Sequence, residues 1–112
     1  MNEQDRELLE QASEAAGYWQ VNGWSTETHK GMRWVDDDGC FERYWNPLKN
    51  NAEAFSLLVK LRLIAGVHEN YSSCAGYSPV GDELHEEHED DIEAATRRVI
   101  VRAAAEMFKG MK

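Results

Sequence analysis

Imidazole and carboxylate groups, the side chains best suited to chemistry, gather in one stretch near the C-terminal end of the chain. His85 and His88 lie there among acidic residues, with no lysine or arginine between them. The acids are Asp82, Glu83, Glu86, Glu87, Glu89, Asp90, Asp91 and Glu93. Imidazole and carboxylate together suit Zn²⁺ or a similar ion. On a strand, however, His85 and His88 would point to opposite faces, whereas on a helical turn they would be neighbours.

We therefore favour a solvated, mobile acidic loop that caps the next helix over a metal site built on His85 and His88. The same charges could imitate the phosphates of DNA, but such a mimic needs acids spread over a face rather than packed in one loop. The sequence assigns no cofactor and no catalytic residue, and the two histidines are its only metal candidates.

Other groups that could do chemistry have simpler interpretations. The run Asp36-Asp37-Asp38-Gly39 predicts a hairpin turn, because a calcium loop would alternate its ligands. Aromatic packing explains the tryptophans better than base stacking does. No Ser-His-Asp order, glycine-rich phosphate loop or Cys-His pair stands out, so the sequence favours a protein that is not an enzyme.

The acidic stretch leads into a helix predicted over residues 91–109. One face of this helix is apolar and should be buried against a sheet. That face holds Ile92, Ala95, Thr96, Val99, Ile100, Ala103 and Met107. Asp90 is the expected N-cap, with Glu93 completing a capping box.

The same helix carries a second, weakly apolar face. Val101 and Phe108 lie on it, and Arg97 and Arg98 border it. Because a helix that covers only one sheet should be polar there, two interpretations remain: ordinary surface, or an interaction surface for a partner or a symmetric dimer. Binding of a phosphate or carboxylate by the arginines is a weaker alternative to a solvated helix face.

Earlier in the chain, hydrophobic periodicity predicts two further helices, over residues 2–16 and 50–61. Asn50 and Glu53 form a capping box for the second, whose wide apolar arc predicts that it is the most buried helix. Gly17 should end the first helix. Strands are predicted over 18–24, 32–35, 40–44, 63–71 and 80–88, with a bulge at Gly66 and a loop over 72–79.

These elements predict an α+β fold. Three helices should flank a mainly antiparallel sheet of four to five strands, giving a sandwich of α/β/α layers. A chain of 112 residues predicts a single domain, spanning 1–112.

Charge and hydropathy limit the classes of partner. The net charge of −9 argues against direct binding to nucleic acid or to an anionic membrane. The longest apolar run is too short for a membrane helix, and the polar start of the chain does not fit a signal peptide. Cys40 and Cys74 are expected to be free thiols in a reducing cytoplasm.

Three segments carry a resemblance to a known family. They are Trp45-Asn46-Pro47-Leu48, the AFSLLVKL segment over 54–61, and the ATRRVIVRAAAE segment over 95–106. Together with the segment over 7–17, they resemble the phage ABA sandwich domain family, small proteins of phages and prophages whose function is not established. The resemblance implies helix layers flanking a sheet and supplies no catalytic residue or cofactor. It also implies a small turn residue, such as glycine, where this chain has Arg62.

The resulting functional hypothesis is a non-enzymatic phage or prophage accessory protein that binds a protein partner or forms a homodimer in the cytoplasm of a bacterial host. One alternative is a small metal-dependent enzyme that uses His85, His88 and nearby carboxylates. A second alternative is an acidic inhibitor that mimics DNA.

Overall fold

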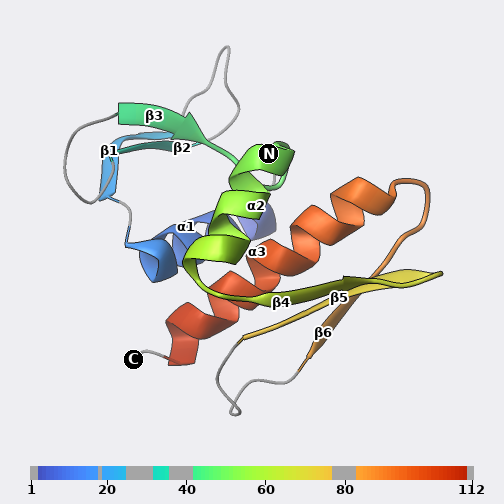
Figure 1. Cartoon of the computed structure of the whole chain (residues 1–112). Coiled ribbons are helices and arrows are strands. Elements are labelled where there is room, and N and C mark those ends of the chain that lie inside the picture. Colours follow the sequence, from blue (N-terminus) through green and yellow to red (C-terminus); the bar gives the residue numbers. More distant parts are fainter. Residues whose placement is uncertain (1–2, 18, 25–31, 36–41, 77–82, 111–112) are drawn as a thin grey trace.

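The computed structural model describes residues 3–17, 19–24, 32–35, 42–76 and 83–110 (Figure 1). These residues form three helices and six strands, and the strands pair antiparallel. In chain order the elements are α1 (Glu3–Ala16), β1 (Trp19–Trp24), β2 (Met32–Val35), β3 (Glu42–Trp45), α2 (Asn51–Lys60), β4 (Ile64–Val67), β5 (Tyr71–Ala75), β6 (Leu84–Glu87) and α3 (Ile92–Gly110). The α+β class and the three predicted helices are confirmed.

The strands divide into two sheets, with the orders β1-β2-β3 and β4-β5-β6. The single sheet of four to five strands that we expected is thus not found among the described residues. The α/β/α layering is not confirmed either. Helix α3 covers one face of the β4–β6 sheet, whereas Ile64 and His85, which point from the other face, are exposed.

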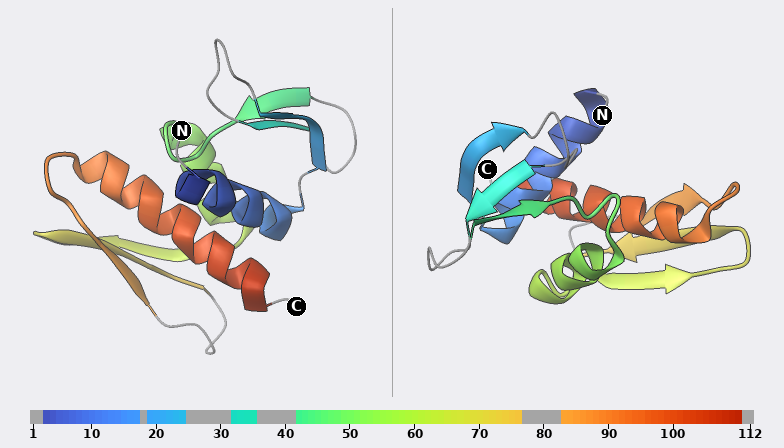
Figure 2. Two further views of the ribbon diagram at one scale, coloured as in Figure 1. Left: turned by 180° about the vertical axis from the view of Figure 1, so that it is seen from behind. Right: turned by 90° about the horizontal axis from the view of Figure 1, so that it is seen from above.

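Helix α3 is the element that the rest of the fold surrounds. Its consecutive residues Val99, Ile100 and Val101 are each at most 5% exposed, which requires packing partners on several sides. Figures 1 and 2 show α1 and α2 on one side of α3 and the β4–β6 sheet on the other. The prediction that the second helix would be the most buried is wrong, because α2 buries only Ala54 and Leu57.

Local signals for the helix ends are mostly confirmed. Asn50 caps α2 by accepting a hydrogen bond from the Glu53 N–H at 3.1 Å. Gly17 follows α1 with a φ of 80°, which suits a residue without a Cβ. At α3, however, the cap is Asp91 rather than Asp90: its Oδ1 accepts from the Ala94 N–H at 3.0 Å.

The region predicted as one strand over 63–71 is instead a hairpin. The His68 N–H donates to the Tyr71 carbonyl at 2.8 Å, and β4 and β5 run antiparallel from this turn. Their register is continuous, so the bulge expected at Gly66 is absent. The predicted loop over 72–79 is wrong where β5 lies: Ser72 and Cys74 are fully buried beneath α3, a site that accepts only small side chains.

In the first sheet, β2 and β3 pair as the predicted hairpin. The turn Asp36-Asp37-Asp38-Gly39 and Cys40 lie outside the described residues. Trp45, at the end of β3, is 1% exposed and belongs to the core, as aromatic packing predicted. The side chains of the other three tryptophans lie outside the description.

Candidate functional site

The structure does not bring His85 and His88 together. His85, on β6, is exposed; its Nε2 lies 2.7 Å from Glu83 Oε1, and its ring tilts against Tyr71. His88, just after β6, is 7% exposed and faces inward. Within the described part of the chain, no three His, Cys, Asp or Glu side chains could hold a metal ion. The metal candidates therefore do not converge on one ion.

His88 instead begins a buried chain of hydrogen bonds. Its Nε2 lies 2.9 Å from Ser72 Oγ, which lies 2.7 Å from Thr96 Oγ1. Because the Thr96 hydroxyl donates to the Ile92 carbonyl at 2.8 Å, Thr96 must accept from Ser72, and Ser72 must accept from His88. Ser72 is also fully buried. A serine nucleophile activated by histidine donates its proton to the imidazole and is open to substrate. Ser72 instead accepts from His88 and is buried, so it does not fit that role.

These hydrogen bonds join the end of β6, β5 and the first turn of α3. They leave His88 Nδ1 buried and without a hydrogen-bond partner. The chain thus fixes the helix over the sheet, and we assign it a structural role.

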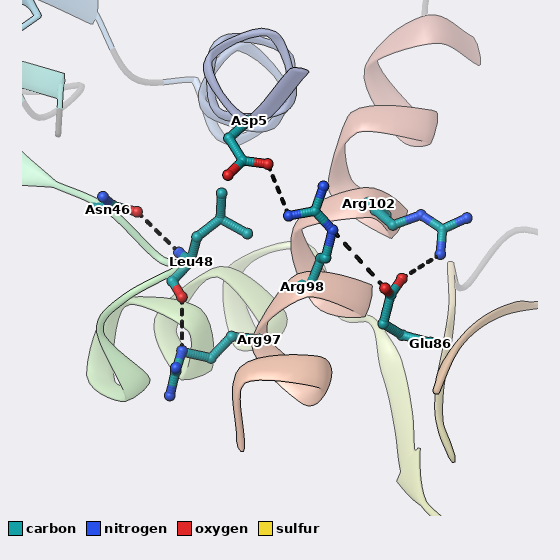
Figure 3. Close-up of polar contacts among 7 residues, drawn as sticks. All are labelled: Asp5, Asn46, Leu48, Glu86, Arg97, Arg98 and Arg102. Atoms are coloured by element: carbon teal, nitrogen blue, oxygen red, sulfur yellow. Dashed lines mark hydrogen bonds and ion pairs between the residues drawn. The ribbon is translucent and has the colours of Figure 1, made fainter. Parts of the chain in front are cut away.

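Arg97 and Arg98 both form hydrogen bonds with other segments of the chain (Figure 3). Arg97 donates from Nε to the Leu48 carbonyl at 2.8 Å, anchoring α3 to the turn before α2. Arg98 donates from Nη1 to Asp5 Oδ1 at 2.8 Å, and its Nε lies 3.9 Å from Glu86 Oε1. Arg98 thus has carboxylate partners within the chain, whereas the partners of Arg97 are a neutral carbonyl and a neutral amide oxygen. Binding of an external anion by these arginines stays a prediction.

Val101 is 0% exposed, so it is no surface residue. It lies one turn from Arg98, which donates to Asp5 on α1, and therefore on the side of α3 that packs against α1. Phe108, on the same side, is half-buried. The prediction that Val101 lies on an interaction surface is therefore wrong, because the face of α3 that carries Val101 and Arg98 packs against α1. The expected packing on a single sheet did not include this second helix contact. Contact of Phe108 or Arg97 with a partner stays a prediction.

The acidic stretch is more ordered than a solvated loop. Glu86 Oε2 accepts from Arg102 at 2.7 Å, Asp91 caps α3, and Glu93 accepts from Asn51. Glu87 and Glu89 are exposed, and Asp82 lies outside the described residues. Several of these carboxylates thus have fixed hydrogen-bond donors within the chain.

An open groove of about 280 Å³ lies where these groups meet. Asp5, Leu48, Glu86, His88 and Arg98 contribute to its walls. Two of its acids, Asp5 and Glu86, already face the Arg98 guanidinium, so the groove is lined by groups that bind one another. We assign it no ligand.

The surface also carries exposed apolar side chains that no contact within the described chain explains. Among the described residues, five large apolar side chains are more than half exposed, and four of them fall in one stretch of the chain. We call these four the α2–β4 surface: Phe55 (66% exposed), Val59 (55%), Ile64 (65%) and Val67 (62%). Ile64 and Val67 are three residues apart on β4, so they lie on opposite faces of that strand. The fifth, Ile92, stands at the start of α3, where its exposure of 53% contradicts the burial predicted for it.

Local structure explains how the α2–β4 surface arises. Phe55 and Val59 are one turn apart on α2, so they share a face. Leu63, buried and bonded through its N–H to the Leu58 carbonyl, turns the chain from α2 directly into β4. The exposed residues of the helix and of the strand are therefore joined by only a short turn (Figure 1).

Searches against protein-family models, curated proteins and solved structures found no match for this chain. Among the described helices, none combines the length and the apolar character that crossing a bilayer requires.

Proposed function

We propose that this chain is a phage or prophage accessory protein that acts by binding protein in the bacterial host cytoplasm, without catalysis. The resemblance of its Trp45–Leu48 segment and of parts of α2 and α3 to the phage ABA sandwich domain family motivates the origin. The observation that carries the mode of action is the α2–β4 surface.

Exposed single apolar residues are common on soluble proteins, but two large ones on one helix face, as Phe55 and Val59 are on α2, begin a patch of the kind found at interaction sites. Phe55 and Val59 have the one-turn spacing with which a helix presents anchors to an apolar groove. An aromatic and a β-branched side chain at more than half exposure would each bury substantial area in such a groove. The partner should therefore offer an apolar recess that accepts one helix face.

Affinity capture from infected host cells tests this proposal. The tagged parent should retain a discrete partner that Phe55→Lys and Val59→Lys lose, because a lysine cannot enter an apolar recess without losing water. Ile92→Lys is the matched control, since it places the same charge on an exposed apolar site outside the α2–β4 surface. Equal capture by all four proteins would contradict the proposal.

A further inference from the structure

One side of the β4 backbone pairs with no other strand among the described residues. Strand β4 is the outer strand of the β4–β6 sheet and pairs only with β5 among the described strands. Hydrogen-bonded and non-hydrogen-bonded pairs alternate in an antiparallel ladder. The bond from the His68 N–H to the Tyr71 carbonyl therefore places Gly66 and Ile64 in bonded pairs with β5. Ala65 and Val67 direct their N–H and C=O groups outward.

This edge has few of the features that usually prevent strand addition. Exposed edge strands are commonly protected by charges, proline or bulges. The sequence of β4 is Ile-Ala-Gly-Val, and its register is regular. Ile64 and Val67 leave 65% and 62% of their surface exposed on either side of the edge. Its main protection is its short length.

From this edge we infer that β4 is a homodimer contact, in which two copies pair their β4 strands antiparallel and join their sheets. The inference rests on the proposed function and names one partner for it, a second copy of this chain. It assigns the second copy to the β4 part of the α2–β4 surface and leaves Phe55 and Val59 for other proteins.

The strand is complementary to itself. Outward-facing residues of two such strands must pair with each other, and a two-fold axis at Gly66 sets Ala65 of one copy opposite Val67 of the other. This register uses every outward N–H and C=O group of Ala65 and Val67 in both copies. Gly66 meets its own symmetry mate at the axis, where the absence of a side chain permits close approach.

Charge complementarity selects the same arrangement. Arg62 precedes β4 and Glu69 follows it, and both are exposed. Antiparallel pairing brings Arg62 of one copy beside the turn that carries Glu69 of the other, twice by symmetry. Parallel pairing would instead set like charges together at each end.

Sedimentation velocity over a range of concentrations, combined with hydrogen exchange, tests the inference. The parent should reach twice the 12.8 kDa chain mass, and the amides of Ala65 and Val67 should become protected as the dimer forms. Val67→Lys should remain monomeric and folded, because its side chain is already exposed. Ile92→Lys, the matched control, should dimerise like the parent.

Mixing two charge variants tests the contact between copies. Arg62→Glu and Glu69→Lys should each weaken their own homodimer about tenfold, since each opposes like charges at both symmetric contacts. Mixed together they should form a heterodimer of parental strength, because both contacts then join opposite charges.

A parent that stays monomeric at every concentration would overturn the inference, as would a Val67→Lys dimer of parental strength or a mixture no stronger than the separate variants. These outcomes are independent of the capture experiment with Phe55→Lys and Val59→Lys. Failure of the homodimer is therefore distinguishable from failure of the proposed function.

Discussion

Arg98 on α3 donates a hydrogen bond from Nη1 to Oδ1 of Asp5 on α1 at 2.8 Å, joining residues 93 positions apart (Figure 3). Both side chains are less than a third exposed, at 28% and 23%. We expect a coupling free energy of about 1 kcal/mol, at the upper end for ion pairs near a surface. Urea unfolding of Asp5→Asn, Arg98→Gln and the double variant measures it. Strictly additive losses would show that the two groups do not act on one another.

Val101 should tolerate no charge. Val101→Lys buries an ammonium group between α3 and α1 and should lower the free energy of unfolding by more than about 3 kcal/mol. Ile92→Lys, on the same helix at 53% exposure, should change it by less than about 1 kcal/mol. Chemical denaturation of both variants decides the point; similar stabilities would mean that α1 does not cover this face.

The sequence predicted α3 and its sheet-facing stripe because a period of 3.6 is visible in Val99, Ala103 and Met107. It did not reveal the second buried side, since Val101 and Ala105 look alike whether a helix or a partner protein covers them. The sequence also did not predict β5, because Ser72-Ser73-Cys74 has little strand propensity. Burial under α3 decides the conformation of this segment.

The α2–β4 surface was missed because a wide apolar arc indicates burial or binding equally well. On α2, the run of Phe55, Leu57, Leu58 and Val59 exceeds what one packing face needs. The family resemblance was more informative at Arg62, where it implied a small turn residue. The structure gives Arg62 a φ of 54°, the left-handed conformation that glycine adopts most easily.

Adjacent glutamates on β6 should respond differently to neutralisation. Glu86 accepts from Arg102 at 2.7 Å and faces Arg98, so Glu86→Gln should cost about 1 kcal/mol of unfolding free energy. Glu87 is exposed, and Glu87→Gln should leave stability unchanged or slightly higher. Thermal unfolding of the two variants checks this; equal losses would rule out a specific role for the arginine contacts.

Burial raises the pKa of the Cys74 thiol to about 11, although a backbone hydrogen bond from Ala75 opposes the shift. Because the folded pKa exceeds the unfolded value of 9.0, stability from the neutral thiol is full below pH 9 and lost as the pH rises toward 11. Unfolding free energies across this window should fall more steeply for the parent than for Cys74→Ala, with a difference on the order of 2 kcal/mol. Parallel pH profiles would contradict a buried thiol.

The most direct test of protein binding through the α2–β4 surface is photo-crosslinking in infected cells, with a photoreactive aromatic residue at position 55 or, as a control, at position 92. Phe55 is an exposed aromatic on that surface and Ile92 an exposed apolar residue outside it. We predict a discrete protein adduct from position 55 that position 92 does not give. Absence of an adduct at position 55, or the same adducts at both positions, would contradict the account.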